Sequence, residues 1–230
     1  MTYAGKVGRG MENFVITVAR GFGSGGRRIA EKLADELQVH SYDNRILTLA
    51  SQYSGYEEHY FREANETLNG SLLTKELLRL PKRFHPKAEL DKFVSDDRLF
   101  DVQKRIIEQL AKSETCVIVG KCADYILRDY ENVFSVYIEA PRAYCRRRVM
   151  ERMDDITIEE TNELITKTDK YRADYYKYYT GGNYWTNPVN YDLTLNNGRL
   201  GDEACVQVIL AGMKIKFGRA FEAYLAGLKI

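Results

Sequence analysis

A glycine-rich loop near the amino terminus is the part of this sequence with the clearest chemistry. Four glycines fall within six positions, with a serine among them: Gly21, Gly23, Ser24, Gly25 and Gly26. Glycine allows successive backbone N–H groups to converge on one anion, and the N-terminus of a following helix adds partial positive charge. The loop therefore predicts a binding site for a phosphate group.

The spacing of the loop is close to the P-loop pattern, in which two glycines separated by four residues precede a lysine and then a serine or threonine. Gly21 and Gly26 occupy the glycine positions. Arg27 stands in place of the lysine, and Arg28 in place of the hydroxyl residue. Arginine can pair with two phosphate oxygens at once, but it cannot ligate magnesium as a hydroxyl would. The alternative interpretation is a glycine-rich turn that binds no ligand.

The loop is flanked by a strand and a helix in the order that a phosphate site requires. Residues 14–19 form an apolar, β-branched run, which is typical of a buried parallel strand. Residues 29–37 carry apolar side chains four apart, which indicates one buried helix face. Four later runs predict further strands: 39–43, 115–119, 133–139 and 191–196. Strands that alternate with helical sequence predict an α/β fold with a five-stranded parallel sheet and helices on both faces.

Charged residues follow the strands at the edge where open α/β sheets bind ligands. Arg27, Asp43 and Lys121 all lie just beyond a strand of this kind. Asp43 either caps the next helix or contacts a substrate, and one residue can do both. In a later helix Arg148 and Arg152 lie four apart and share a face. We expect these two arginines to contact phosphate, the alternative being a solvated surface.

The domain organisation follows from length and composition. With 230 residues, 44% of them hydrophobic, the chain can bury one full core. We expect residues 1–10 to be a flexible leader or an expression remnant, and residues 11–230 to form a single P-loop domain. A helical insert is expected at about 54–95, where it either covers a substrate or packs as a peripheral unit or dimer surface. A lid is expected at about 154–185.

Several classes of partner can be weighed from composition. The four cysteines form no CxxC pair, and no secretory signal or membrane-spanning run is present, which predicts a cytoplasmic protein without membrane contact. A net charge of +1 argues against nucleic-acid binding. Lysines and tyrosines interleave at 167–179, where they could stack on single-stranded nucleic acid, close over a nucleotide, or pack on the core. The helical tail at 214–228 can dock on the sheet or on a second subunit, which leaves a homodimer open.

Together these motifs resemble the cytidylate kinase-like family, a branch of the P-loop nucleoside monophosphate kinases. The resemblance extends from residue 14 to about residue 210 and is carried by six stretches: 16–27, 42–43, 119–127, 148–152, 167–181 and 187–193. It implies a three-layer P-loop NTPase fold with a helical substrate-binding insert and a lid. It also implies that the protein transfers the γ-phosphate of ATP to a nucleoside monophosphate, CMP or dCMP by the family name.

The resemblance also implies roles for individual residues. Arg27 would span the β- and γ-phosphates of ATP, with Arg28 beside it in the donor-binding loop. Lys121 falls where the better-known cytidylate kinases have an arginine that holds the acceptor phosphate. The cations that would close over the transferring group are Arg148, Arg152 and Arg172, and the other substrate contacts would be Asp43, Asp124 and Lys170.

The pair Arg27-Arg28 departs from the family pattern and has two consequences. Mg²⁺ bound with ATP would be held by water, nucleotide oxygens or another carboxylate, because the loop supplies no serine or threonine at that position. The departure also favours an alternative function, a nucleotide- or phosphate-binding regulatory protein that kept the kinase fold but transfers phosphate weakly.

Overall fold

The computed structural model describes residues 13–43, 96–153 and 155–228 of the chain. The expected leader at 1–10 and the expected insert at about 54–95 lie outside these residues. Asp154, at the beginning of the expected lid, also lies outside them.

One parallel sheet organises the fold, with its strands in the order β2-β3-β1-β4-β5. The strands are β1 (Val15–Arg20), β2 (His40–Tyr42), β3 (Cys116–Val119), β4 (Val133–Glu139) and β5 (Leu193–Asn196). β1 lies at the centre between β3 and β4, so that Val18 lies opposite both Val119 and Val136. Central parallel strands are buried on both faces, which explains the continuous apolar runs that predicted them. The predicted five-stranded parallel sheet is confirmed.

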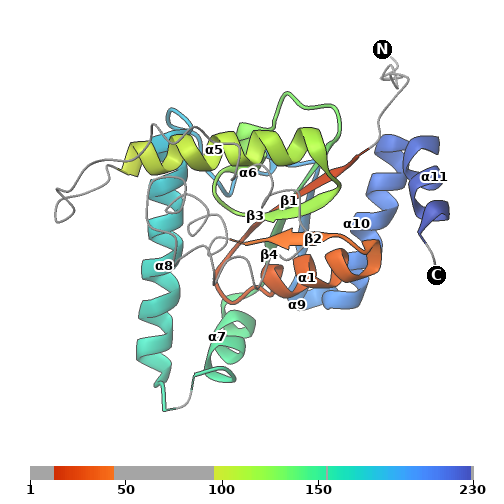
Figure 1. Ribbon diagram of the computed structural model, residues 1–230. Coiled ribbons are helices and arrows are strands. Elements are labelled where there is room, and N and C mark those ends of the chain that lie inside the picture. Colours follow the sequence, from red (N-terminus) through yellow and green to blue (C-terminus); the bar gives the residue numbers. More distant parts are fainter. Residues whose placement is uncertain (1–12, 44–95, 154, 229–230) are drawn as a thin grey trace, which may run out of the picture.

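Helices cover both faces of the sheet and give the fold three layers (Figure 1). One face is covered by α1 (Gly26–Leu37), α10 (Asp202–Phe217) and α11 (Arg219–Gly227), and the other by α5 (Asp96–Ser113), α6 (Ala123–Ile126) and α8 (Ile158–Tyr179). Side chains of β1 alternate between two cores, with Ile16 and Val18 on the α1 face and Val15 on the α8 face. The other elements of the described ranges are α7 (Arg142–Met150), α9 (Asn197–Leu200) and a 3₁₀ helix at Pro188–Asn190.

The helix α8 occupies most of the segment expected as a lid. It begins at a capping box, in which Thr157 Oγ1 accepts a hydrogen bond from the Glu160 N–H (3.2 Å) and Glu160 Oε2 accepts one from the Thr157 N–H (2.9 Å). Toward its C-terminal end the helix buries Tyr176 in the core, while Tyr171 and Tyr178 stay exposed. The tyrosines of α8 therefore divide between the core and the surface.

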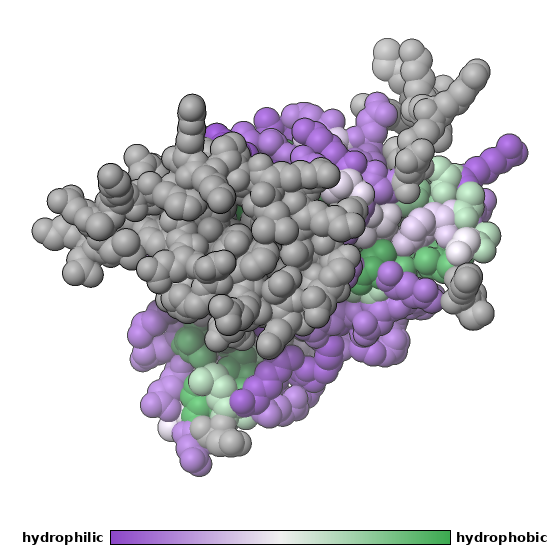
Figure 2. Space-filling model, in the orientation of Figure 1, coloured by the Kyte–Doolittle hydropathy of each residue, from purple (hydrophilic) through white to green (hydrophobic). Residues whose placement is uncertain are grey.

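The C-terminal helices are held to the central strand by aromatic side chains. The ring centroid of Phe14, the residue before β1, lies 5.0 Å from that of Phe217 and 5.2 Å from that of Phe221. Figure 2 shows a mostly hydrophilic surface over the described residues, with an apolar area beside α10 and α11. None of the helices in the described ranges combines the length and the apolarity needed to cross a membrane.

Replacement of Phe221 by alanine is expected to lower the free energy of unfolding by about 3–5 kcal/mol, because the lost ring leaves a cavity in the core. Phe221 is 0% exposed, whereas Ile215 on α10 is 87% exposed. The matched control Ile215→Ala should therefore change the free energy of unfolding by no more than about 0.5 kcal/mol. Urea unfolding followed by circular dichroism measures both values, and equal losses in the two variants would show that α11 does not pack as described.

Candidate active site

The glycine loop connects β1 to α1, and at two of its positions both the backbone conformation and the lack of space require glycine. Gly23 and Gly25 adopt φ angles of +80° and +91°, which residues with side chains rarely do. A Cβ on Gly23 would lie 2.8 Å from the carbonyl oxygen of Cys145, and a Cβ on Gly25 would overlap the side-chain amide of Asn197. Both glycines are therefore needed for the loop to follow this path.

The N-terminus of α1 presents uncapped N–H groups to the loop. No side chain caps the helix, and the N–H of Ile29 is the first to bond back, to the carbonyl of Gly25 (3.1 Å). Among the described residues, the N–H groups of residues 26–28 have no intramolecular acceptor. A helix end of this kind attracts an anion through its N–H groups and its dipole. The geometry of the loop therefore suits a phosphate group.

Asn197, the first residue of α9, holds the loop in place. It is 1% exposed, and its Nδ2 donates to the carbonyl oxygen of Ser24 (2.7 Å) and to Asp202 Oδ1 (2.9 Å). The Ser24 hydroxyl donates in turn to the carbonyl oxygen of Gly21 (2.9 Å). These bonds fix the peptide groups of the loop. Asn197 was not among the predicted site residues. Its place directly after β5, at the ligand-binding edge of the sheet, could have indicated it.

The structure brings Arg27 and Asp43, two of the predicted site residues, into contact. The Nη2 of Arg27 lies 3.2 Å from Asp43 Oδ2, and its Nε lies 3.0 Å from Glu31 Oε1. The side chain of Arg27 is 65% exposed, so its guanidinium lies at the rim of the loop. Arg28 pairs instead with Asp202 on α10, and this interaction raises the pKa of Arg28.

The described residues offer no protein ligand set for Mg²⁺. Arg28 occupies the position of the usual hydroxyl residue, and its guanidinium is engaged by Asp202. No group of three or more His, Cys, Asp or Glu side chains within the described ranges could hold a metal ion. Binding of Mg²⁺ through nucleotide oxygens, water or another carboxylate therefore stays a prediction.

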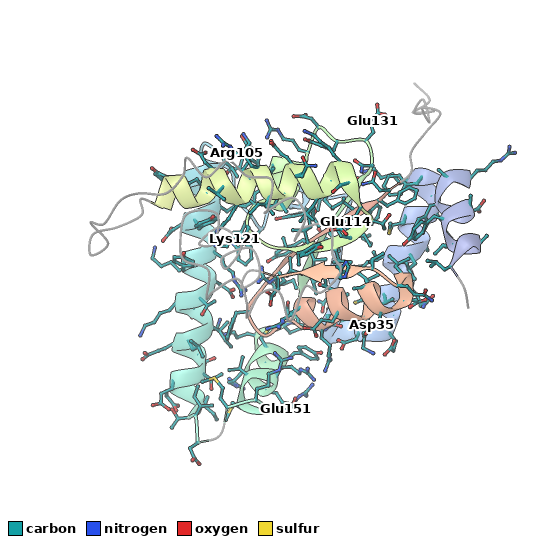
Figure 3. All side chains as sticks on the ribbon, in the orientation of Figure 1. Asp35, Arg105, Glu114, Lys121, Glu131 and Glu151 are labelled. Carbon is teal, nitrogen blue, oxygen red and sulfur yellow. The ribbon has the colours of Figure 1, made fainter. Side chains whose placement is uncertain are left out.

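The turn after β3 has an unusual backbone. Gly120, Lys121 and Cys122 have successive φ angles of +78°, +57° and +57°. Left-handed conformations cost roughly 1–2 kcal/mol at residues other than glycine, and such strain collects at functional sites. The turn carries Lys121 to the space between β3 and α8 (Figure 3), where its Nζ lies 5.1 Å from the ring centroid of Tyr175.

Two side chains of α8 contact the backbone on either side of Gly21. Asp169 Oδ1 accepts a hydrogen bond from the N–H of Phe22 (2.8 Å), and Arg172 Nη1 donates to the carbonyl oxygen of Arg20 (3.0 Å). Asp169 and Arg172 also pair with each other (3.4 Å). Burial raises the pKa of Asp169 and lowers that of Arg172. The sequence analysis identified Arg172 but missed Asp169, although their i,i+3 spacing places both on one helix face.

A small pocket of about 60 Å³ lies beside the loop, between the ends of β1 and β3 and the side of α8. Three basic side chains line it, those of Arg20, Lys121 and Arg172. The other lining residues are Ala19, Gly120, Cys122, Asp124, Tyr171, Tyr175, Tyr176, Trp185 and Tyr191. The pocket therefore collects the predicted residues Lys121, Asp124 and Arg172 from different elements. A cationic pocket of this volume suits a small anionic group rather than a whole nucleotide.

Asp124 is the buried carboxyl of this pocket. It is 6% exposed, and the hydroxyl of Tyr176 donates to its Oδ2 (2.7 Å). Burial raises the pKa of Asp124 to about 6, while the hydrogen bond from Tyr176 acts in the opposite direction. Asp124 can therefore gain or lose a proton close to neutral pH.

A comparison with models of protein families shows to which family the chain belongs. The model of the cytidylate kinase-like family matches residues 15–199, a range that contains the glycine loop, the turn after β3 and α8. The chain belongs to the cytidylate kinase-like family. This confirms the predicted family, and it places the protein among kinase-like phosphotransferases.

One solved structure shares the fold of this cytidylate kinase-like protein, and a second is similar at a lower score. An uncharacterized protein from Eubacterium ventriosum is 23% identical, with a TM-score of 0.63 over 90% of this chain and 100% of its own. Shikimate kinase from Bacteroides thetaiotaomicron is 12% identical, with a TM-score of 0.46 over 88% of this chain and 96% of its own. No curated protein sequence matches the chain.

Three cations that the cytidylate kinase-like resemblance associates with substrate are not among the residues lining the pocket. The side chain of Arg148 is 18% exposed, and its Nη1 lies 3.6 Å from Oε2 of Glu151, the residue after α7. Arg152 is exposed. Lys170 is 72% exposed at its side chain and pairs with Asp174 (2.8 Å). The roles of these three residues stay predictions.

Arg20 is a pocket residue that the sequence analysis missed. It ends β1 directly before Gly21 and lines the pocket with Lys121 and Arg172. Burial, followed by repulsion from Arg172, lowers the pKa of Arg20 to about 9, so the side chain is still charged at neutral pH. A basic residue at the end of an otherwise apolar strand was the available signal.

The raised pKa of Asp124 predicts a specific pH dependence of stability. Because the pKa of about 6 in the folded protein exceeds the ordinary 3.8, Asp124 contributes most to stability at low pH. Relative to Asp124→Asn, the free energy of unfolding of the wild type should fall by on the order of 2–3 kcal/mol as pH rises from about 4 to about 7. Urea unfolding across this range measures the difference.

Asp129→Asn is the matched control, because the Asp129 side chain is 83% exposed and the substitution removes the same carboxylate outside the core. Its difference from the wild type should stay constant with pH. A constant difference for Asp124→Asn as well would contradict the burial of an ionisable carboxyl at this position.

Proposed function

We propose that this protein transfers the γ-phosphate of ATP to a nucleoside monophosphate, CMP or dCMP. The observation that carries the proposal is the pocket lined by Arg20, Lys121 and Arg172, because Arg20 directly precedes the glycine loop that leads to the uncapped N-terminus of α1. Phosphoryl transfer requires in-line positioning, charge neutralisation and exclusion of water, with little covalent chemistry from the protein. A phosphate-binding loop next to a cationic acceptor pocket supports this reaction.

On the donor side, the uncapped N–H groups of residues 26–28 bind oxygens of the β-phosphate, helped by the dipole of α1. Arg27 reaches the β- and γ-phosphates when its guanidinium leaves Asp43, from which it lies 3.2 Å away. The Arg27 side chain of this pair is 65% exposed, so solvent screens the interaction in part and a polyphosphate with more negative charge can replace Asp43, which is 15% exposed. ATP is therefore the proposed donor.

On the acceptor side, Lys121 binds the phosphate of the monophosphate. The ring of Tyr175, 5.1 Å from the Lys121 Nζ, provides an aromatic surface close to this cation for the base. Asp124 accepts or donates a hydrogen bond that orients the acceptor, as its pKa of about 6 permits. No general base is required, because the attacking oxygen belongs to a phosphate that is already ionised.

Closure of the segment at 154–185 excludes water that would otherwise hydrolyse ATP. Arg148 and Arg152 approach the transferring group on closure, and Arg172 already contacts the backbone beside the loop. Gly181 and Gly182 support a hinge at the end of α8, since their φ angles are +69° and +105°. These conformations require glycine and allow the backbone to bend.

The alternative is a regulatory protein that binds a nucleotide or phosphate and transfers little. Two observations favour it. Arg28 pairs with Asp202 where a hydroxyl residue would contact Mg²⁺, and Arg27 pairs with Asp43 at the rim of the loop. Both hypotheses require anion binding at the glycine loop, so turnover distinguishes them.

Replacement of Lys121 by alanine is expected to lower kcat/KM for the monophosphate by about 10²–10³-fold, because a cation that faces the acceptor phosphate is lost. ADP release with ATP and a panel of ribo- and deoxyribonucleoside monophosphates measures the rate and identifies the acceptor. Lys167→Ala is the matched control, because Lys167 lies on the exposed side of α8 with its side chain 77% exposed. This control should keep wild-type kinetics.

The panel also decides between the two functions. ADP release above the rate of ATP hydrolysis with one or more monophosphates supports the kinase. Tight ATP binding by calorimetry, without transfer to any monophosphate, contradicts the kinase and selects the regulatory protein.

Replacement of Arg27 by alanine is expected to lower kcat by at least about 10²-fold through the loss of a cation on the transferring phosphate. The side chain of Arg27 is 65% exposed. The free energy of unfolding should therefore change by no more than about 0.5 kcal/mol. Initial rates and urea unfolding measure the two effects, and unchanged turnover would remove Arg27 from the mechanism.

A further inference from the structure

The side chain of Arg20 lies across the carboxyl edge of the sheet, between the donor loop and the acceptor pocket. A Cβ on Gly26 would lie 2.5 Å from the Cβ of Arg20, so the base of the side chain packs against the start of α1. A Cβ on Gly120 would overlap the Arg20 Nη1, so the guanidinium reaches the turn after β3. The side chain therefore spans the distance from the phosphate loop to the residue before Lys121.

Glycine at position 120 serves two purposes in this arrangement. Its φ of +78° begins the left-handed turn that carries Lys121. The absence of a Cβ also leaves the space that the guanidinium of Arg20 occupies. Arg20 and Lys121 thus reach one pocket from adjacent strands, β1 and β3.

Arg20 differs from the other arginines around the loop in its partners. Arg27, Arg28 and Arg172 each form an ion pair with a carboxylate. Within the described part of the chain, the guanidinium of Arg20 forms no ion pair and no hydrogen bond. Burial and the repulsion from Arg172 lower its pKa, while Asp43 and Asp169 compensate only in part.

We propose that Arg20 is a catalytic residue that contacts the phosphoryl group as it passes from donor to acceptor. This inference rests on the proposed kinase function for the identity of the group, but the binding of a phosphate by Arg20 does not depend on turnover. A cation that forms no ion pair among the described residues, and that lies between two phosphate sites, is arranged to receive an anion.

The transfer step itself requires no proton movement by Arg20. An oxygen of the acceptor phosphate forms a bond to the γ-phosphorus, while the bond from that phosphorus to the β–γ bridging oxygen breaks and leaves its electron pair on ADP. Negative charge on the three peripheral oxygens of the moving group is neutralised by N–H groups of the guanidinium. Arg20 stays protonated throughout, as its pKa of about 9 allows at neutral pH.

The competing explanation is that Arg20 only supports the fold. Thermal unfolding separates the two explanations. An uncompensated, largely enclosed charge destabilises the folded state, so its removal should leave the melting temperature unchanged or raise it. Removal of a structural arginine should lower the melting temperature instead.

The test compares the wild type with Arg20→Gln, Arg20→Lys and Arg219→Gln. Arg219 is exposed on α11, so Arg219→Gln removes the same charge at a distance from the pocket. Isothermal titration with inorganic tripolyphosphate measures anion binding without an acceptor. We expect about tenfold or weaker binding for Arg20→Gln, an intermediate loss for Arg20→Lys, and no change for Arg219→Gln. The melting temperature of each ligand-free variant should equal or exceed that of the wild type.

Turnover is measured in parallel with ATP and the active monophosphate. The fall in kcat for Arg20→Gln should exceed its fall in tripolyphosphate affinity, because a cation placed between the donor and acceptor sites contacts the moving group most closely in the transition state. Binding within about twofold of the wild type overturns the proposal. Failure of Arg20→Gln to fold, or a melting temperature several degrees lower, also overturns it by assigning Arg20 a structural role.

The two proposals can fail separately. If the wild type transfers phosphate to no monophosphate while Arg20→Gln loses tripolyphosphate binding, the kinase function fails and the phosphate contact of Arg20 stands. If the wild type is active and Arg20→Gln keeps its kcat, the role of Arg20 fails and the kinase function stands.

Discussion

A phosphate-binding loop must keep its shape while the N–H groups that bind the ligand have no protein acceptor. Among the described residues, the N–H groups of residues 26–28 are in this position, so the loop cannot be held by those hydrogen bonds. It is held by groups that the ligand does not need. Asn197 bonds the peptide group of Ser24 from one side, and Asp169 bonds the N–H of Phe22 from the other. The rest of the fold places the side chains of Asn197 and Asp169 beside the loop.

The arginines around the loop repel one another, and carboxylates from different parts of the fold compensate their charges. Asp43 follows β2, Asp169 lies on α8 and Asp202 begins α10, and each pairs with an arginine at or beside the loop. These pairs compensate the arginines when no ligand is bound. Arg27 is the more exposed of the two arginines, with 65% of its side chain exposed against 36% for Arg28, so its pair with Asp43 is screened more by solvent than the pair of Arg28 with Asp202.

The sequence predicts the elements that depend on local patterns and misses the contacts that join distant segments. The sheet and α1 follow from apolar periodicity, and the structure confirms them. Asn197 and Asp169 bond loop residues 173 and 147 positions away, which no local pattern reveals. Tyr191 was assigned to the last strand, but it ends the 3₁₀ helix at Pro188–Asn190, and its N–H bonds to the carbonyl of Pro188, so β5 begins only at Leu193.

The two hydrogen bonds from α8 to the backbone on either side of Gly21 affect how a ligand enters and leaves the pocket. An outward swing of this helix separates Asp169 from the N–H of Phe22 and Arg172 from the carbonyl of Arg20 at the same time. The same movement of α8 would therefore change both the access to the pocket beside Lys121 and the rigidity of the glycine loop. Under the proposed function, a triphosphate that makes the glycine loop more rigid would also favour the packed position of α8, so binding at the loop would be coupled to binding in the pocket without contact between the two ligands.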